Sequence, residues 1–370
     1  MLSKTKSFIK NESVFCISLL CAVATMFFVP VNAEYIEYID FRVLCLLLCL
    51  MGVVAGFKSV GAFKWLTYEM LHRTNSGRVL GIILVALPFF SSMLVTNDVA
   101  LLVFVPFTLG LLAQMNCEKS IVPAIVLQTV AANLGSMATP VGNPQNLFLY
   151  SAYNLSAGEF FSVTFPLTVA SLVVLMIASA FILPKDLPHQ NYEKESINSK
   201  RNILIFATLF ILCLFTVFRV VPYIATTVIV VAVLLIIDRK LLKEIDFMLL
   251  LTFVCFFIIS ENLGRIEVVR DFLQNLLSKS TLLTSVGASQ VISNVPAAVL
   301  LSAFTDDWKS LLAGVNIGGL GTPIASLASL ITLKIYMKNK DAKIGKFILI
   351  FTVANIIGLV ILMAFQYIIL

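Results

Sequence analysis

The sequence predicts an all-α polytopic membrane protein made of two inverted-topology repeats, each with a re-entrant hairpin and a broken transmembrane helix. Three observations predict this fold. The 370 residues are 59% hydrophobic and 12% charged, whereas soluble domains run at roughly 45–50% and about 25%. The string N-[LI]-G-x-x-x-T-P occurs twice, at residues 133–140 and 316–323. The distribution of Lys and Arg gives the two halves opposite orientations.

Both strings lie inside apolar stretches where a helix would otherwise continue. Glycine and proline interrupt helices, because glycine adds backbone entropy and proline lacks an N–H. In lipid an unpaired backbone group is costly, so irregular backbone survives only where it is buried in protein or lines a cavity. A break that recurs in both halves of a chain is typical of secondary transporters, whose site lies between the breaks.

Apolar runs of about 17–25 residues span a bilayer as helices, and the first repeat, residues 1–183, is divided on that basis. Its elements are a helix at 13–32, an acidic loop with Glu34, Glu37 and Asp40, a helix at 41–57, an amphipathic interfacial segment at 58–78, a hairpin at 79–115, a broken segment at 121–150 and a helix at 160–183.

The N-terminus allows two interpretations. Lys4, Lys6 and Lys10 precede an apolar run that ends Val31-Asn32-Ala33, a pattern that resembles a cleavable signal peptide. The run is long for that role, and the repeat uses it as a span, so we favour a retained first helix. In both cases Glu34 starts outside the cytoplasm.

A polar linker and a connector helix, together 184–222, lead to the second repeat, residues 223–370. Its elements are helices at 223–237 and 247–262, a mixed-charge segment at 264–279, a hairpin at 280–304, a broken segment at 311–337 and a last helix at 347–369.

Three markers recur in the same order in both halves. Ile39-Asp40-Phe41 matches Ile245-Asp246-Phe247, Thr96-Asn97 matches Ser293-Asn294, and the two broken strings follow. When every basic cluster is placed in the cytoplasm, Asp40 lies outside and Asp246 inside. This orientation puts the N-terminus in the cytoplasm and the C-terminus outside the cytoplasmic membrane.

The hairpin tips are the first candidate binding groups. Thr96, Asn97 and Asp98 form one tip, and Ser293 and Asn294 begin the other. Carbonyl and amide oxygens suit Na⁺, whereas N–H and hydroxyl donors suit an anion. We therefore expect transient Na⁺ at Asn97 and Asn294. The alternative is that these side chains are helix caps or interhelical hydrogen bonds.

The breaks supply the second set of candidates. Half-helices starting at Pro140 and Pro323 would aim positive dipole ends at the middle of the membrane, where they favour negative charge. A kinked helix without a ligand is the alternative. The substrate- and ion-binding candidates are Asn133, Gly135, Thr139, Pro140, Gly142, Asn143, Asn146, Asn316, Gly318, Thr322, Pro323 and Ser326.

Asp98 is the ionisable residue best placed within the apolar depth, where such residues are costly and usually functional. It could ligate a cation or take up a proton, or else be a fixed cap or ion pair. The corresponding position in the second half is Val295, so the two halves are chemically unequal.

Other classes of function lack support in the sequence. No G-x-x-x-x-G-K-[ST] string is present, which argues against ATP hydrolysis. The seven cysteines form no CxxC pair, and His72 and His189 fall in polar connections, so we expect no metal site and no cofactor beyond the coupling ion. The net charge of +6 lies mainly in loops and implies no nucleic-acid partner. An intramembrane enzyme would need paired catalytic groups at depth, and a channel seldom needs paired broken helices.

Several of these strings resemble the ion transporter superfamily, which includes divalent anion–sodium symporters, citrate transporters, arsenite efflux permeases and some sodium–proton antiporters. The matching strings are Thr96-Asn97-Asp98-Val99-Ala100, Asn133-Leu134-Gly135 through Asn146, and Ser293-Asn294-Val295-Pro296-Ala297. The resemblance covers nearly the whole chain. It implies sodium sites at the tips and breaks, substrate between them, and a homodimer. Symporters of this group tend to carry Ser-Asn-Thr at both tips, and the Asn97-Asp98 tip is closer to the arsenite-permease branch.

We therefore expect a secondary transporter that moves a small anion across the lipid bilayer, coupled to Na⁺ or H⁺, by alternating access. An arsenite or metalloid efflux permease, or a sodium–proton antiporter, is the first alternative. An intramembrane enzyme is the remote one.

Overall fold

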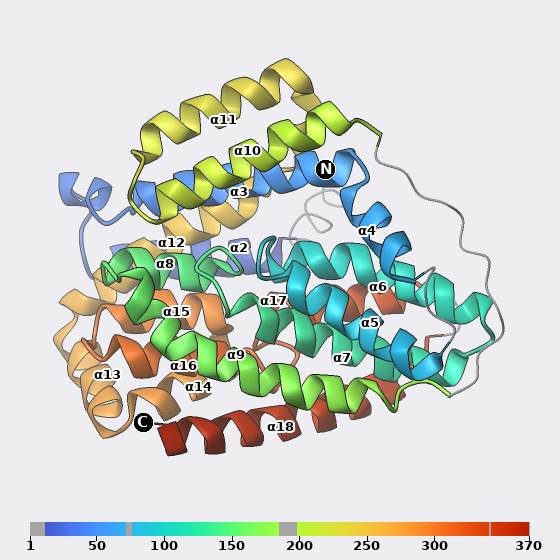
Figure 1. The fold of residues 1–370 in the computed structure, drawn as a ribbon. Coiled ribbons are helices and arrows are strands. Elements are labelled where there is room, and N and C mark those ends of the chain that lie inside the picture. The colour runs from blue at the N-terminus through green and yellow to red at the C-terminus, as the bar shows by residue number, and fades with distance from the viewer. Residues whose placement is uncertain (1–11, 72–75, 185–197, 340–341, 370) are drawn as a thin grey trace, which may run out of the picture.

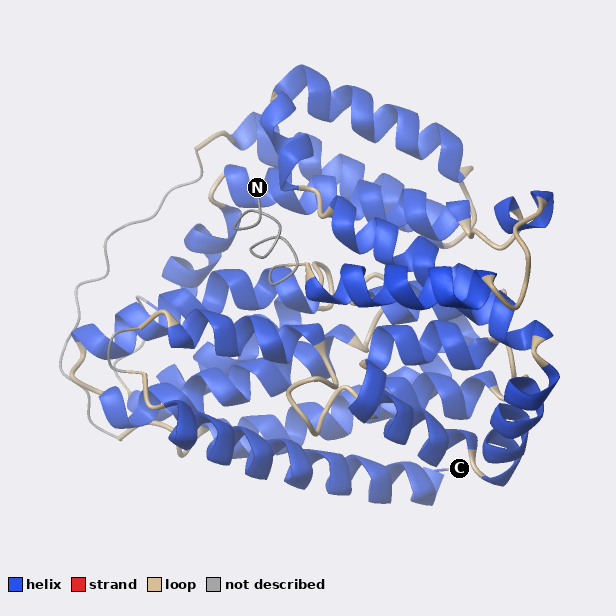
Figure 2. Cartoon of the chain, turned by 180° about the vertical axis from the view of Figure 1, so that it is seen from behind, coloured by secondary structure: helices blue, strands red, loops and turns tan. Residues whose placement is uncertain are grey.

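The protein is helical throughout the part of the chain that its structure, a computed structural model, describes: residues 12–71, 76–184, 198–339 and 342–369 (Figure 2). Within these ranges there is no strand, six helices are long and apolar enough to cross a membrane, and five shorter helices are also apolar. The prediction of an all-α polytopic membrane protein is confirmed. Lys4, Lys6, Lys10, His72 and His189 lie outside the described residues.

The elements follow the predicted order. In the first half they are α2 (Ser13–Met26), η1 (Ala33–Ile36), α3 (Phe41–Ser59), α4 (Ala62–Leu71), α5 (Gly77–Ser91), α6 (Asn97–Gln114), α7 (Glu118–Ser136), α8 (Pro144–Ala152) and α9 (Ala157–Ser179). In the second half they are α10 (Lys200–Val217), α11 (Tyr223–Ile237), η2 (Arg239–Glu244), α12 (Phe247–Arg265), α13 (Glu267–Lys279), α14 (Thr281–Ile292), α15 (Asn294–Ser302), α16 (Trp308–Ile317), α17 (Leu327–Met337) and α18 (Ile344–Ile369).

The helices pack in two groups (Figure 1). The scaffold group consists of α2, α3, α10, α11, α12 and η2, and the core group consists of α5 to α9 and α14 to α18. Short helices join the groups: α4 contacts α3 and α5, and α13 contacts α12 and α14. The two hairpins and both breaks therefore belong to the core group.

The recurring Ile-Asp-Phe marker is a helix start in both halves. Asp40 accepts the backbone N–H of Val43 at the beginning of α3, and Asp246 accepts the N–H of Leu249 at the beginning of α12. An N-cap carboxylate satisfies one of the unpaired donors that every helix leaves at its first turn. The marker recurs because both helices need the same cap.

The half-helices begin four residues later than predicted, at Pro144 and Leu327 rather than at Pro140 and Pro323. After each of the earlier prolines the chain makes a single turn, closed by Gly142 N–H on Thr139 O and by Ala325 N–H on Thr322 O. Asn143 and Ser326 are then extended and occupy the N-cap positions. Asn143 accepts the N–H of Asn146, so it starts the helix more effectively than a proline without a cap.

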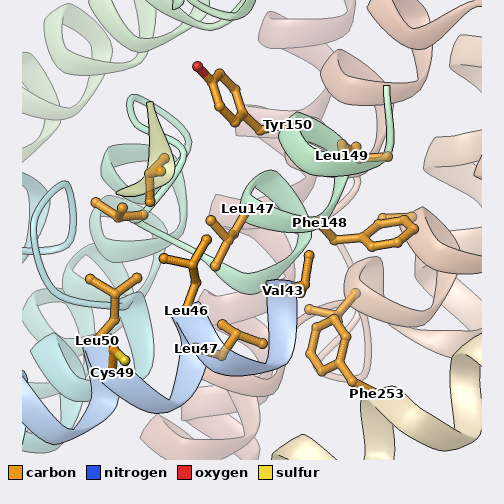
Figure 3. Close-up of a cluster of buried hydrophobic side chains, with 14 of the residues drawn as sticks. Val43, Leu46, Leu47, Cys49, Leu50, Leu147, Phe148, Leu149, Tyr150 and Phe253 are labelled. Atoms are coloured by element: carbon orange, nitrogen blue, oxygen red, sulfur yellow. The ribbon is translucent and has the colours of Figure 1, made fainter. Parts of the chain in front are cut away.

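The α8 half-helix packs on the scaffold through apolar side chains (Figure 3). Leu147 and Phe148 of α8 face Val43 and Leu46 of α3, and Phe148 lies 5.7 Å from Phe257 of α12 between ring centroids. All of these residues are buried. Burial of this apolar surface holds the first break against the scaffold.

Gly135, at the end of α7, is a packing requirement of the core group. A Cβ atom added there would lie 2.1 Å from the carbonyl oxygen of Phe89 in α5, whereas one added at Gly110 in α6 would meet nothing within 4 Å. Only glycine allows the α5 and α7 backbones to approach this closely.

We predict that Gly135→Ala lowers the free energy of unfolding by about 1–3 kcal/mol, the usual cost of overpacking. Gly110→Ala is the matched control, and we expect it to be neutral or to stabilise helix α6 by up to about 1 kcal/mol. Thermal unfolding of the purified variants in detergent measures both. Equal melting temperatures for the two variants would contradict the prediction.

Candidate ion- and substrate-binding site

Four helix N-termini meet inside the core group. The tip of the first hairpin bonds to the first break, where Asn97 N–H donates to Gly142 O at 3.3 Å. The tip of the second hairpin bonds to the second break, where Asn294 N–H donates to Ala325 O at 2.9 Å. The starts of α6 and α8 are therefore adjacent, as are the starts of α15 and α17.

Asn133, in the last turn of α7, joins these two pairs. Its Oδ1 accepts Asn97 Nδ2 at 3.0 Å and Ser326 Oγ at 2.9 Å. Its Nδ2 donates to Gly319 O at 3.4 Å. One amide side chain thus contacts the first hairpin tip and both ends of the second break.

Asn316 has the corresponding role at the end of α16. Its Nδ2 donates to Asn146 Oδ1 at 2.7 Å and to Leu312 O at 2.8 Å. Its Oδ1 accepts Asn143 Nδ2 at 3.2 Å. We call these side chains the asparagine cluster; its members, each at most 5% exposed, are Asn97, Asn133, Asn143, Asn146, Asn316 and Ser326.

The bonds of the two halves correspond. Asn133 and Asn316 begin the two repeated strings, and their partners Ser326 and Asn143 each lie ten residues beyond the other string's first residue. The threonines of the strings correspond as well: Thr139 Oγ1 donates to Met93 O, and Thr322 Oγ1 donates to Gln290 O at 3.1 Å. These paired bonds support an internal repeat. Its inverted orientation across a membrane stays a prediction.

The asparagine cluster is made of neutral amides and a hydroxyl. Helix N-termini carry partial positive charge and unpaired N–H groups, so their convergence favours an anion. Amide side chains offer both donors and acceptors, so the cluster can exchange its internal bonds for bonds to a ligand. Ser329 Oγ, near the start of α17, is buried without a hydrogen-bond partner among the described residues and is a free donor beside this centre.

Asp98 lies outside the asparagine cluster, on a cavity of about 260 Å³ between α3, α6 and the start of α12. Thr96 lines the same cavity, and Lys58 pairs with Glu244 at 3.3 Å among its lining residues. The counterpart cavity of the second half, about 310 Å³, contains Ser293, Pro296 and otherwise mainly apolar residues of α2, α12, α14, α15 and α17. The first cavity is therefore lined in part by carboxylates, whereas the lining of the second cavity includes no charged side chain.

Comparison with known proteins then places the chain in a family. A family model described as citrate transporter matches residues 12–307. The chain belongs to the citrate transporter family. The resemblance to the ion transporter superfamily is thereby confirmed, and the protein is a multi-pass membrane protein of a transporter family.

Similar proteins carry transporter or membrane-protein names. The chain is 34% identical over 336 residues to an uncharacterized transporter of Methanocaldococcus jannaschii, which covers 90% of this chain and 91% of the relative. It is 30% identical over 330 residues to the Escherichia coli inner membrane protein YbiR, covering 88% of each. It is 32% identical over 161 residues to the silicon efflux transporter LSI3 of Oryza sativa, covering 43% of this chain and 33% of the relative.

In this member of the citrate transporter family, the remaining candidates surround the asparagine cluster. Gly142 is part of the first break, and Pro140 is buried beside it. A Cβ atom added at Gly318 would lie 2.7 Å from Ser289 Oγ of α14, so this glycine, like Gly135, lies close against a neighbouring helix. Thr322 is exposed and Pro323 half-buried, so they lie at the edge of the second break. Ser293, with φ 72°, turns the tip.

Sequence reasoning missed Gln290 and Ser136. Gln290 Nε2 donates to Gly318 O and Leu320 O at 2.8 and 2.9 Å, and its Oε1 accepts Thr322 N–H. It therefore ties α14 to the second break. Ser136 Oγ accepts Asn143 Nδ2 at 3.1 Å. A glutamine inside an apolar helix, three residues before a hairpin tip, was a usable signal for the first.

We predict that Asn316→Ala destabilises the protein, because it leaves Asn143 Nδ2 and Asn146 Oδ1 each short of a partner. A buried polar group without its partner costs about 1–3 kcal/mol, so we expect a lower melting temperature in detergent. Asn275→Ala, on the exposed face of α13, is the control and should unfold like the parent. The prediction is wrong if the two alanine variants have the same melting temperature.

Proposed function

We propose that this protein is a secondary active transporter that moves a small anion across the cytoplasmic membrane, coupled to Na⁺ or H⁺, by alternating access. The family and the names of the relatives point to a transporter rather than an enzyme. The observation that carries the proposal is the convergence of four helix N-termini on a buried cluster of neutral amides. The anion is therefore held by helix dipoles and hydrogen bonds.

The asparagine cluster supports a carrier because it joins the two halves directly. Its bonds from Asn133 to Ser326 and from Asn316 to Asn143 cross from one break to the other. A ligand that replaces such bonds contacts both breaks at once. Broken helices at the interface between repeats are the usual location of substrate in secondary transporters.

Unequal contacts at the two ends of α3 support alternating access. At the Asp40 end, the scaffold binds the far end of α8: Asp40 Oδ2 accepts Ser151 Oγ, and Arg219 donates to the carbonyls of Tyr150 and Asn154. At the Lys58 end, about 28 Å away along a 19-residue helix, the cavity beside Asp98 lies between the groups, next to the apolar cluster that contains Val54 and Phe104. One end is closed and the other is partly open.

Tyr153 reinforces the closed end. Its hydroxyl donates to the carbonyl of Ser302, the last residue of α15 in the other half, and to that of Thr305 just beyond it. Burial raises the pKa of Tyr153 above its ordinary value, so the hydroxyl stays a donor across the physiological range. The ends of α8 and α15 thus close together against the scaffold.

A metalloid efflux permease is the second candidate. The printed name of the rice relative is a silicon efflux transporter, although it matches 43% of this chain. The cluster supports this alternative because uncharged amides also suit a hydroxylated metalloid acid, with donors and acceptors on both partners. The homodimer implied by the resemblance is compatible with either candidate.

Substrate class is tested with the purified protein. We expect one anion class, in a thermal-shift panel of oxyanions, carboxylates and arsenite with and without Na⁺, to raise the melting temperature, because ligand at 100 times its Kd adds about 2.7 kcal/mol. The same anion in proteoliposomes should show trans-stimulated counterflow, which a channel or an enzyme does not. Stabilisation and counterflow by arsenite alone would favour the efflux permease. No counterflow with any compound would refute the transporter proposal.

Orientation is tested separately. The charge distribution predicts that the end of α18 faces outside and the N-terminus faces the cytoplasm. A reporter enzyme that is active only outside the cytoplasm should be active when fused after α18 and inactive when fused after α9. Equal activity of the two fusions would contradict the inverted arrangement, and the reverse pattern would contradict the predicted orientation.

A further inference from the structure

Two carboxylates from different groups line one cavity. Asp98 belongs to the first turn of α6 in the core group, and Asp246 caps α12 in the scaffold group. Both line the cavity of about 260 Å³ beside α3, whose other walls are mainly apolar side chains such as Leu47, Met51 and Val103. Two negative charges thus line one cavity between the groups, with Asp98 partly buried and Asp246 exposed at its rim.

Asp98 lies in the first turn of α6, where the helix dipole favours a negative charge, but its carboxylate has no paired cation among the described residues. Its Oδ1 atom is shielded from solvent and has no hydrogen-bond partner among the described residues. Thr96, rather than Asp98, is the N-cap of α6. A desolvated carboxylate without donors or a paired cation is costly, so a cation at this oxygen would relieve the cost.

The other charged groups around the cavity leave Asp98 unpaired. From α3, Lys58 reaches Glu244 of η2 at 3.3 Å, so the ammonium group is already matched. From α12, Asp246 uses Oδ1 to accept the N–H of Leu249, and its carboxylate adds negative potential toward Asp98. The lining therefore carries an excess of two negative charges, which attracts a cation.

We propose that Asp98 and Asp246 form the binding site for a small monovalent cation, a proton or Na⁺, between the core and scaffold groups. This inference rests on the proposed function and assigns its coupling ion to one place. When the site is empty, the two carboxylates repel each other and disfavour approach of the groups. When a cation neutralises Asp98, the core group passes the apolar wall of the scaffold without a bare charge.

The site has no equivalent in the second half. Val295 occupies the position of Asp98, and the counterpart cavity is lined by residues such as Ile17, Phe256 and Leu300. The hydroxyls of Ser18 and Ser293 are the oxygen-bearing side chains of that cavity, and its lining includes no carboxylate. Among the described residues, the carboxylate pair is therefore found at the first hairpin tip, where it faces the start of α12.

The test uses three variants of the full chain. Asp98→Asn removes the central carboxylate. Asp246→Asn removes the facing charge and keeps the helix cap, because asparagine caps as well as aspartate. Asp40→Asn is the matched control: it makes the same change at the N-cap of α3, which faces Ser151 instead of this cavity.

Melting temperature is measured in two series: against pH without Na⁺, and against Na⁺ at constant pH with choline as replacement. We expect the parent to gain stability as the cation is added, in the pH series for a proton or in the Na⁺ series for sodium. Asp98→Asn should lose this response. Asp246→Asn should need about tenfold more cation, the effect of one nearby charge in a partly desolvated site. Asp40→Asn should respond like the parent.

Three outcomes would overturn the inference: no response of the parent in either series, a response of Asp98→Asn equal to that of the parent, or an equal displacement by Asp40→Asn and Asp246→Asn. If Asp98→Asn does not fold, Asp246→Asn and Asp40→Asn still decide the matter. Counterflow of the anion in the parent separates this result from failure of the transporter proposal, because counterflow can persist while the assignment of the cation site fails.

Discussion

The structure depends on satisfying backbone and amide groups at two interrupted helices inside an apolar protein. A helix break in a low-dielectric interior leaves donors and acceptors that water cannot reach. The chain meets this requirement with side-chain amides: Asn133 and Asn316 end the first helix of each break, and Asn143 starts the next. Because hydrogen bonds such as Asn133–Ser326 and Asn316–Asn143 run between the two breaks, the polar groups of each break depend on residues of the other half.

The hydrogen bonds between the two breaks satisfy buried amide groups without using charged side chains. The side chains of the asparagine cluster are uncharged, and each of them is hydrogen-bonded. They therefore hold the helix ends together without a buried ion pair. Amide groups also exchange partners readily, since each has donors and acceptors. The donors and acceptors that join the two breaks are therefore of the kinds that bind a polar ligand.

The halves share a framework and differ in charge. Paired bonds from Thr139 and Thr322 to the hairpins, and paired caps at Asp40 and Asp246, repeat the same local solution. Asp98 gives the cavity of the first half a carboxylate, whereas the counterpart cavity of the second half is lined mainly by apolar side chains. The two halves therefore share a backbone framework and differ in the charge beside it.

Much of this could be predicted from the sequence, because hydropathy, Gly and Pro and the repeated strings act locally. They predicted an all-α membrane protein, the order of its helices, the helix pairs of the two hairpins and all six members of the asparagine cluster. The half-helices start four residues later than predicted, because Asn143 and Ser326 are extended and occupy the N-cap positions, and Asn143 also accepts the N–H of Asn146. Gln290 was missed because its partners are carbonyls about 30 residues away along the chain.

Only the tertiary structure decided which of these polar groups meet. Asn133 and Ser326 are 193 residues apart, and no local pattern specifies a hydrogen bond at that separation. Asp98 and Asp246 likewise line one cavity only because the core group packs against the scaffold in this way. The sequence by itself determined where the helices break, since backbone chemistry is local. Packing decided which polar groups the two breaks bring together, since the cluster requires groups from both halves at bonding distance.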